Sequence, residues 1–375
     1  MKNRGLRIWI EINKKAAKNN YQIFRNLIGK NCLLMAVVKS NAYGHGLVDF
    51  SRLMQKFGID WFGVDSITEA LALRESGIKK KILVLGYTLP ERLKDAAENN
   101  ISLTVSSLAH LAALSKLKFR QSPRIHLKID TGMHRQGFSP KELPSALNLI
   151  KKLKNKTVAE GIYTHFAAAK NPSFPADTLG QLRLFDAAVN TVKKAGFNPI
   201  RHASATSGTI IFPQAHYDLV RVGIGLYGLW PSKEVQAAFG AQIKLKPILL
   251  WKAVIGEIKK AARGERIGYD FTETLSRPTT IAVIPIGYWH GFPRALSGIG
   301  RVLIKSKPAK VLGRVSMDMI SVDVSGIKAK IGDEAILIGK DGKNTVSADD
   351  IADLCSTSSY EIISRLNPLI KRIYC

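Results

Sequence analysis

The sequence predicts an α/β fold, a (β/α)8 TIM-like barrel followed by a mostly β C-terminal domain. Eight short runs rich in β-branched residues alternate with amphipathic stretches between residues 30 and 230. From about residue 240 the pattern changes to short strands separated by Gly and Asp turns. Alternating β and α segments with eight strands favour a barrel, because an open doubly wound sheet usually has fewer strands and a Gly-rich first turn. The alternative is an open doubly wound sheet whose strands have been miscounted.

The elements expected in each domain follow from hydrophobic periodicity. Barrel strands are expected at 34–38, 61–64, 82–85, 101–105, 125–129, 161–164, 200–203 and 219–224. Helices are expected at 13–27, 66–75, 90–99, 141–154 and 177–194, and strands of the second domain at 251–258, 281–286, 302–304, 311–314, 320–324 and 335–338. We therefore place the barrel domain at residues 1–238 and the β-rich domain at 239–375, with the early run 7–12 as a strand that can pair with the second domain.

The composition is that of a soluble protein with an unusual charge. The chain has 56 Lys and Arg against 29 Asp and Glu, a net charge of +27, spread in short groups. Such a charge attracts polyanions, but no nucleic-acid motif accompanies it, so specific nucleic-acid binding is not expected. No apolar run reaches the roughly 20 residues of a membrane span, and the N-terminus lacks the apolar stretch of a signal peptide. Three scattered cysteines indicate a reducing cytoplasm and no metal site.

Lys39 ends the first predicted strand, in the stretch MAVVKSNAYGHG at 35–46. A single lysine at a strand end is more often a solvated charge than a functional group. In a barrel, however, the carboxyl ends of all strands meet on one face, so useful side chains there can cluster. The others at these ends are Tyr43, Lys128, Asp130, Arg135, His165, His202, Thr206, Ser207, Gly208, Arg221, Gly223, Ile224 and Tyr227.

The loops after the seventh and eighth strands predict a phosphate site, because hydroxyls and glycines there let backbone N–H groups approach an anion. A lysine on the first strand, this phosphate site and an arginine between them predict a site for pyridoxal phosphate (PLP), whose aldehyde forms a Schiff base with a lysine. Each residue alone is a weaker indication, since a lone barrel arginine is usually part of an ion pair and a lone buried histidine is usually hydrogen-bonded in the core.

The motif AVVKSNAYGHG resembles the bacterial alanine racemases, and the resemblance extends over nearly the whole chain. It implies a two-domain, PLP-dependent homodimer of fold type III in which Lys39 holds the cofactor covalently. It also implies that Leu85 packs under the cofactor ring. The remaining cofactor-binding positions are Tyr43, His202, Thr206, Gly223, Ile224 and Tyr360.

Two arginines match family positions with distinct roles. Arg135, in DTGMHRQGF, resembles the arginine that binds the cofactor's phenolic oxygen and the substrate carboxylate, and Lys128 matches a position often carbamylated to hold that arginine. Arg221 matches the arginine that faces the pyridine nitrogen. Because a guanidinium keeps its protons at ordinary pH, that nitrogen stays unprotonated and the ring is a weaker electron sink, which favours racemisation over transamination.

Racemisation needs two proton-transfer groups on opposite faces of a planar intermediate. Lys39 is one, and by resemblance the other is Tyr269 of GERIGYDF, supplied by the partner subunit and hydrogen-bonded to His165. Without the resemblance, Tyr269 would be interpreted as a packed aromatic residue.

Two further stretches, IPIGYWHGFPR and LGRVSMDMISVDV, also resemble the family and would reach the partner's active site. Met317 would hold the substrate carboxylate through its backbone, with Tyr288 and Asp318 in supporting positions. The alternative is that the glycines only form turns and that Asp318 is a strand-end charge.

The chain also departs from the usual family pattern. Where GYADGYPR is common it has Trp289 and His290, and the other departures are His134, Ala205, Thr206 and Ser316. Thr206 keeps a hydroxyl, so phosphate binding is still expected. The large Trp289 puts the access corridor, and with it the substrate range, in doubt.

These features predict a cytoplasmic, homodimeric enzyme that interconverts L- and D-alanine and supplies D-alanine for cell-wall peptidoglycan. A racemase of the same fold for serine or for a broad range of amino acids is one alternative. A PLP decarboxylase of related fold is disfavoured, because it would place a carboxylate where this chain has Arg221. A non-enzymatic PLP-carrying or polyanion-binding protein remains open because of the net charge of +27.

Overall fold

The computed structural model describes residues 5–153 and 157–375, and the contacts within the chain divide it into two compact units. The barrel unit comprises residues 15–42 and 47–247. The β unit comprises, among the described residues, 248–375, 5–14 and the short segment 43–46. The boundary expected between residues 238 and 239 stays a prediction.

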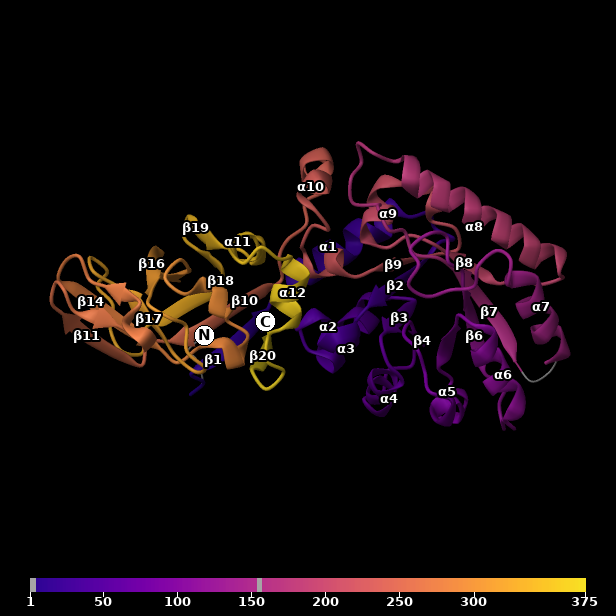
Figure 1. Ribbon diagram of the computed structural model, residues 1–375, viewed down its shortest axis with the longest axis horizontal. Helices are drawn as coiled ribbons and strands as arrows, with labels where there is room; N and C mark the ends of the chain where they lie inside the picture. Colours follow the sequence, from indigo (N-terminus) through magenta and orange to yellow (C-terminus); the bar gives the residue numbers. More distant parts are fainter. Residues whose placement is uncertain (1–4, 154–156) are drawn as a thin grey trace. The chain divides into compact units, whose positions relative to one another are not determined.

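The barrel unit contains, within its described residues, an eight-stranded sheet in the order β8-β7-β6-β5-β4-β3-β2-β9 (Figure 1). All seven pairings along this order are parallel. The strands are β2 (Leu33–Val37), β3 (Trp61–Val64), β4 (Lys81–Val84), β5 (Ser102–Val105), β6 (Arg124–Lys128), β7 (Val158–Tyr163), β8 (Ile200–His202) and β9 (Leu219–Val222). Backbone hydrogen bonds from Asp218 N to Arg201 O (3.1 Å) and from Arg221 N to Ser204 O (3.0 Å) join the region of β8 to that of β9. The sheet is thus a nearly closed barrel, and the predicted fold class is confirmed.

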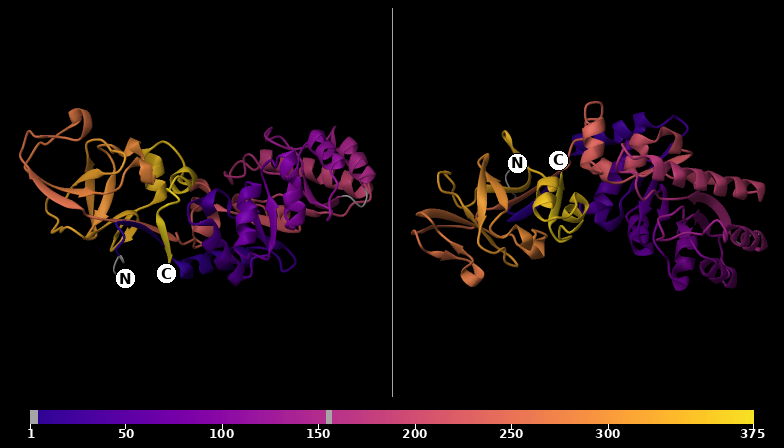
Figure 2. Two further views of the ribbon diagram at one scale, coloured as in Figure 1. Left: turned by 90° about the horizontal axis from the view of Figure 1, so that it is seen from below. Right: turned by 45° about the horizontal axis from the view of Figure 1, so that its top comes forward.

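Helices cover the outside of these strands, as α4–α8 show in two directions of view (Figures 1 and 2). The helical segments are α1 (Lys14–Leu27), α2 (Lys39–Tyr43), α3 (Leu47–Phe57), α4 (Ile67–Glu75), η1 (Pro90–Arg92), α5 (Leu93–Glu98), α6 (Leu108–Lys116), α7 (Leu143–Lys152), α8 (Ala176–Lys194), α9 (Thr206–Ile211), η2 (Pro213–Ala215), η3 (Ile224–Tyr227) and α10 (Lys233–Phe239). Pro90 starts a 3-10 turn ahead of α5, as expected. The expected helix 141–154 is shorter, and its last residue lies outside the described residues. No helix in the described ranges is long and apolar enough to cross a bilayer.

The barrel strands are buried on both faces, which explains their continuous apolar runs. Met35, Trp61, Leu83 and Leu219 form one buried cluster that joins four strands. The ring of Trp61 meets that of His126 edge-on at 5.3 Å between centroids. Because His126 is completely buried, polar groups as well as apolar ones occupy the barrel interior.

The β unit is built on one sheet in the order β11-β14-β17-β16-β15-β18-β10-β1-β20, with β19 paired to β18 and a small β12-β13 pair. Its strands are β1 (Ile8–Ile12), β10 (Leu249–Val254), β11 (Glu257–Ala261), β12 (Arg266–Ile267), β13 (Glu273–Thr274), β14 (Thr279–Ile284), β15 (Arg301–Ile304), β16 (Lys307–Leu312), β17 (Ile320–Asp323), β18 (Glu334–Asp341), β19 (Asn344–Val346) and β20 (Lys371–Tyr374). Strand β1 pairs antiparallel with β10 and parallel with β20. The helical segments are η4 (Tyr269–Phe271), η5 (Tyr288–His290), η6 (Arg294–Leu296), α11 (Ala348–Leu354) and α12 (Ser359–Ser364).

The single strand expected at 251–258 is wrong, because two strands with different neighbours occupy this stretch. Strand β10 pairs with β1 and β18, whereas β11 pairs with β14. Between them Ile255 N donates to Asp333 O and Gly256 N to Val283 O, both at 2.9 Å, so the chain changes partner at these residues. Trp251, Ala253 and Ile255 keep an alternating pattern, but Gly256 and Glu257 break it before Ile258, so the sequence did carry a signal of the change that the prediction of one strand ignored.

Candidate active site

Lys39 lies two residues after Val37, the end of strand β2, and begins α2, a left-handed turn in place of an ordinary helix. Ser40, Asn41 and Ala42 have φ angles of 55°, 55° and 52°. Non-glycine residues avoid this conformation, at a cost of roughly 1–2 kcal/mol each, so the surrounding structure has to hold it. Asn41 supplies part of that support, because its side-chain oxygen accepts a hydrogen bond from Leu47 N at 2.9 Å. The turn therefore fixes the backbone at Lys39.

The ammonium group of Lys39 lies 3.3 Å from Asp65 Oδ1, and both side chains are partly exposed. An exposed ion pair of this kind contributes little to stability, since solvent and salt screen it. Lys39 can exchange this partner for another at little cost.

Arg221, on β9, is the buried centre of the polar groups in the barrel unit. Its Nη1 donates to His202 Nδ1 at 2.9 Å, and the two N–H groups of its Nη2 donate to Thr164 O at 2.8 Å and Ala203 O at 2.9 Å. His165 Nδ1, 3.3 Å from Nη2, is a weaker third acceptor that shares one of these N–H groups. All these acceptors are uncharged. Burial lowers the pKa of Arg221 to about 10, which leaves the guanidinium charged at neutral pH.

Tyr163, at the end of β7, was not predicted as a site residue, yet it contacts three that were. Its ring stacks on His202 with centroids 4.6 Å apart and planes within 5°. The Lys128 ammonium lies 4.4 Å from the ring centroid and the Arg221 guanidinium carbon lies 5.1 Å from it. Such contacts stabilise a cation by the ring's quadrupole. The hydroxyl of Tyr163 bonds to Thr104 Oγ1 at 2.8 Å, and burial raises the pKa of Tyr163 to about 12.

Lys128 is buried at the end of β6. Burial lowers its pKa well below the ordinary lysine value, and the charges of Arg221 and Arg135 lower it further, against an opposing effect of Asp130. A lysine in this environment is biased toward the neutral amine.

The two histidines bonded to Arg221 are neutral for related reasons. Burial lowers the pKa of both His165 and His202 well below the ordinary value, and the charge of Arg221 is the next cause for each. Because Arg221 only donates hydrogen bonds, Nδ1 of each ring accepts, and the proton of each neutral ring lies on Nε2. Their Nε2 atoms are donors.

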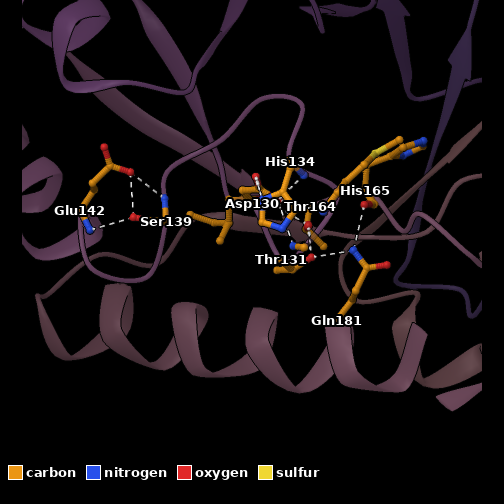
Figure 3. A network of polar contacts seen from close by, with 11 residues as sticks. Asp130, Thr131, His134, Ser139, Glu142, Thr164, His165 and Gln181 are labelled. Atoms are coloured by element: carbon orange, nitrogen blue, oxygen red, sulfur yellow. Dashed lines mark hydrogen bonds and ion pairs between the residues drawn. The ribbon is translucent and has the colours of Figure 1, made fainter. Parts of the chain in front are cut away.

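Arg135 is exposed on the loop from Asp130 to Phe138. Figure 3 shows Asp130 and His134 of this loop. Asp130 Oδ1 accepts hydrogen bonds from the N–H groups of three following residues, the last being His134 at 3.1 Å. Phe138 N closes the loop by donating to Lys128 O at 2.8 Å. The loop thus holds Arg135 within electrostatic range of Lys128.

Helix α8 supports the next loop through Gln181 (Figure 3). Its side-chain nitrogen lies 3.2 Å from Thr131 Oγ1 and 3.5 Å from His165 O, and its oxygen accepts from Ala167 N at 2.8 Å. Thr131 in turn bonds to Thr164 at 2.7 Å. The loops after β6 and β7 are therefore linked, which fixes the backbone of His165.

Thr206, Gly223 and Ile224, the predicted phosphate-binding residues of the barrel, lie together and are buried. Thr206 Oγ1 accepts from Gly223 N at 3.2 Å and from Gly225 N at 3.5 Å, which joins the loops after β8 and β9. A Cβ atom on Gly225 would lie 2.3 Å from the ring of Phe24, so only glycine fits there. Leu85, another predicted contact, packs beside the apolar cluster of the barrel strands.

Tyr43 and Tyr360 belong to the β unit and contact each other. Their ring centroids are 6.1 Å apart. Burial raises the pKa of Tyr43 to about 12. It also raises that of Tyr360, to which the neighbouring Tyr43 adds.

Other predicted residues of the β unit lie on its surface. Tyr269 is 68% exposed, and Tyr288 and Met317 are also exposed. Tyr288 N donates to Ser316 O at 3.0 Å and Trp289 N donates to Met317 O at 3.1 Å, so the two predicted stretches lie side by side. Asp318 is exposed at the same turn.

The donor set of the barrel unit suits an anionic ligand. Arg221 is a buried cation beside neutral histidines and carbonyl groups, and the charge of Arg135 acts on Lys128 and His165. A guanidinium whose direct hydrogen-bond acceptors are all neutral favours binding of a phosphate or phenolate group. Among residues 5–153 and 157–375, no group of three His, Cys, Asp or Glu side chains is placed to hold a metal ion.

Comparison with known proteins decides the family. The model of the alanine racemase N-terminal domain matches residues 12–231, and that of the alanine racemase C-terminal domain matches residues 248–374. The chain belongs to the alanine racemase family.

Relatives of this family match over nearly the whole chain. The alanine racemase of Leptospira interrogans is 39% identical over 373 residues, 97% of this chain and 95% of that protein. Among solved structures, the alanine racemase of Clostridium difficile 630 has a TM-score of 0.91 at 34% identity and covers 99% of this chain and 96% of its own. The alanine racemase of Bacillus anthracis with bound L-Ala-P has a TM-score of 0.93 at 31% identity, with 98% and 95% covered.

Three polar residues on the barrel strands of this chain were missed in the sequence analysis, namely Tyr163, His126 and Glu160. The signal for one of them was present, because His126 and Lys128 in HLK are two residues apart and therefore face the same side of strand β6. A buried polar residue at this spacing from a predicted site residue points into the barrel interior.

Proposed function

We propose that the protein is a PLP-dependent racemase that interconverts L- and D-alanine. Membership of the alanine racemase family supports this function. The observation that carries it is Arg221, a buried cation held by neutral histidines and carbonyl groups at the carboxyl ends of the barrel strands. When bound, PLP supplies an electron sink that lets the α proton of an amino acid leave.

The residues of the chain fit this cofactor. Lys39 would hold its aldehyde covalently, and the weak ion pair with Asp65 leaves the lysine available. Arg221 would donate to the pyridine nitrogen, and Arg135 to the phenolic oxygen and the substrate carboxylate. Leu85 would pack beneath the ring. The phosphate would be held by Thr206, Gly223, Ile224, Tyr43 and Tyr360. His202 would support Arg221 through their hydrogen bond.

Lys128 would support Arg135 from the barrel interior. Its lowered pKa favours the neutral amine, which is the form that reacts with carbon dioxide. Carbamylation would give Arg135 an anionic partner.

Two groups would move the α proton on opposite faces of the substrate, Lys39 Nζ and Tyr269 Oη. In this proposal the domain 1–238 of one subunit supplies Lys39 and the domain 239–375 of its partner supplies Tyr269. His165, whose Nε2 is a donor, would hydrogen-bond the Tyr269 oxygen and stabilise its negative charge. The backbone of Met317 would hold the substrate carboxylate, with Tyr288 and Asp318 in supporting positions.

A homodimer is supported by the surface of the β unit. Tyr269, Phe271, Tyr288, Trp289, Met317 and Met319 are all exposed there. Groups of exposed aromatic and methionine side chains mark interaction surfaces. We further propose a cytoplasmic location and a role in supplying D-alanine for peptidoglycan.

The experiment is racemisation of L- and D-alanine by the purified protein, measured with the visible absorption of its bound cofactor. The proposal expects turnover in both directions and an absorption band that Lys39→Ala abolishes. Serine and basic amino acids, assayed beside alanine, test the same-fold alternative that the exposed Trp289 favours. Release of carbon dioxide would indicate a decarboxylase. Cofactor binding without turnover of any amino acid would contradict the enzymatic proposal.

A further inference from the structure

Glu160 is a buried carboxylate near the amino end of β7, on the side of the barrel away from Lys39. Its oxygens lie 2.7 Å from Lys81 Nζ, 3.4 Å from Arg124 Nη1 and 3.4 Å from His126 Nε2, and accept a hydrogen bond from Ser102 Oγ. Burial raises the pKa of Glu160, but the hydrogen bonds outweigh it and bring the pKa to about 2. Glu160 is therefore an anion at neutral pH.

A continuous chain of side chains joins this anion to Arg221. His126 Nδ1 lies 2.8 Å from His202 Nε2, and His202 Nδ1 lies 2.9 Å from Arg221 Nη1. Both imidazoles are completely buried. The four groups thus cross the barrel interior from its amino end to the candidate active site.

Only one assignment of the ring protons of His202 and His126 agrees with the donors in this series of side chains. Arg221 donates to His202 Nδ1, so the proton of neutral His202 lies on Nε2 and is donated to His126 Nδ1. The proton of His126 then lies on its own Nε2, which faces Glu160. The two hydrogen bonds from Arg221 to His202 and from His202 to His126 therefore point from the cation toward the anion and polarise one another. The last link is electrostatic attraction across 3.4 Å, because His126 Nε2 makes no hydrogen bond among the described residues.

The surrounding residues leave little room for another arrangement. A Cβ atom on Gly161 would lie 2.2 Å from His126 Nδ1, so the imidazole fills the space that glycine leaves. Trp61 meets the edge of His126, and Tyr163 stacks on His202. Lys81 and Arg221 are the cations that act on His126, while Arg221 and Lys128 act on His202.

We propose that Glu160, acting through His126 and His202, is the counter-ion of Arg221 and fixes the position of its guanidinium. A buried cation that contacts only neutral groups is costly, and a polarised relay to a carboxylate reduces that cost. The proposal rests on the proposed function, in which Arg221 donates to the cofactor ring. Glu160, His126 and His202 are positioning residues, since they act through Arg221.

A purely structural role is the competing explanation. Glu160 could simply link the amino ends of neighbouring strands through Lys81 and Ser102. In that case loss of the Glu160 charge would lower the stability of the fold. It would not alter His202, because His126 separates His202 from Glu160.

The test is ¹⁵N NMR of the histidine rings in the full-length holoprotein, before and after Glu160→Gln. In the wild type, His126 and His202 should both be neutral with the proton on Nε2, across pH 6 to 8. Glu160→Gln should shift the His202 ring signals or mix its two tautomers, whereas Glu160→Asp, which keeps the charge, should stay close to the wild type. Asp218→Asn is the matched control, because it removes a carboxylate paired with Arg201 at the same end of the barrel.

A proton on Nδ1 of either ring in the wild type would overturn the relay, and this result does not depend on the folding of any variant. An unchanged His202 spectrum in folded Glu160→Gln would overturn it as well. We also expect Glu160→Gln to lower kcat for alanine about tenfold with KM nearly unchanged, since Arg221 is affected and substrate contacts are not. If the wild type racemised no amino acid, the proposed function would fail while the ring signals still decided the relay.

Discussion

The polar groups around Arg221 in the barrel unit and the loops around Tyr269 and Met317 in the β unit present their candidate site residues in opposite ways. In the barrel unit, Arg221, Lys128 and His202 are buried and held by contacts with one another and with Tyr163. In the β unit, Tyr269 and Met317 stand exposed on surface loops. The groups around Arg221 are therefore held in place by their own chain, whereas the exposed residues would gain further contacts from the second subunit of the proposed dimer. This difference is the main structural argument for a site shared between subunits.

The largest expected effect is the loss of Lys39. Lys39→Ala should lower racemisation at least about 10³-fold in both directions, because it removes both the cofactor attachment and one proton-transfer group. Coupled assays for L- and D-alanine, with the cofactor absorption spectrum, measure this. Lys194→Ala, at the exposed end of α8, is the control and should behave as the wild type. Equal losses in both variants would refute the role of Lys39.

Tyr269→Phe should lower turnover about 10²- to 10³-fold and slow proton exchange from one enantiomer more than from the other, since only one face loses its base. Exchange of the α proton with deuterated solvent, followed separately for L- and D-alanine, gives the readout. Tyr87→Phe, another exposed tyrosine but in the barrel unit, serves as the control. A symmetrical loss would argue against a face-specific role for Tyr269.

The sequence predicted the barrel well because each strand is a buried apolar run followed by a loop. Lys39 and His165 lie beyond the ends of β2 and β7, and Arg221 lies within β9 one residue before its end, as strand counting predicted, while their roles stay predictions. The interior relay escaped prediction, since Glu160 and His126 come together from different strands only in the folded barrel. The left-handed turn at Ser40 to Ala42 also escaped, because Ser and Ala rarely adopt positive φ and Asn41 alone, a residue that tolerates it, does not predict three such residues in a row.

The β unit was less predictable for a related reason. Strand β11 lies at the end of the sheet order and reads EIKKA, which contains too few apolar residues to mark a separate strand after β10. Short strands such as β12 and β13 contain two residues each, too few for any periodicity.

Glu160 should give the barrel an acid-sensitive component of stability. Its pKa is about 2 when folded and about 4.5 when unfolded, so its stabilisation is complete above pH 4.5 and is lost as the pH falls toward 2. Urea unfolding from pH 7 to pH 2 should show a stability gap between wild type and Glu160→Gln that shrinks through this window. Glu98→Gln, on the exposed end of α5, is the control. A gap that stayed constant with pH would contradict the assignment.

The smallest effect is expected at Trp289. Because its side chain is 58% exposed, Trp289→Ala should leave the thermal midpoint of unfolding nearly unchanged. It should change the ratio of kcat/KM for serine to that for alanine by about two- to fivefold, if this side chain limits access in the dimer. Ile331→Ala, an exposed apolar residue elsewhere in the β unit, is the matched control. An unchanged ratio would remove Trp289 from the specificity of the site.

The shared site itself is tested most directly by mixed dimers of Lys39→Ala and Tyr269→Phe subunits. If each site takes Lys39 from one subunit and Tyr269 from the other, a mixed dimer has one site with both native groups. Random exchange of equal amounts should then restore about a quarter of wild-type activity, because half of the dimers are mixed and each has one intact site of two. If both groups came from the same subunit, every site would carry a defect, and mixing would restore no activity above that of the separate variants.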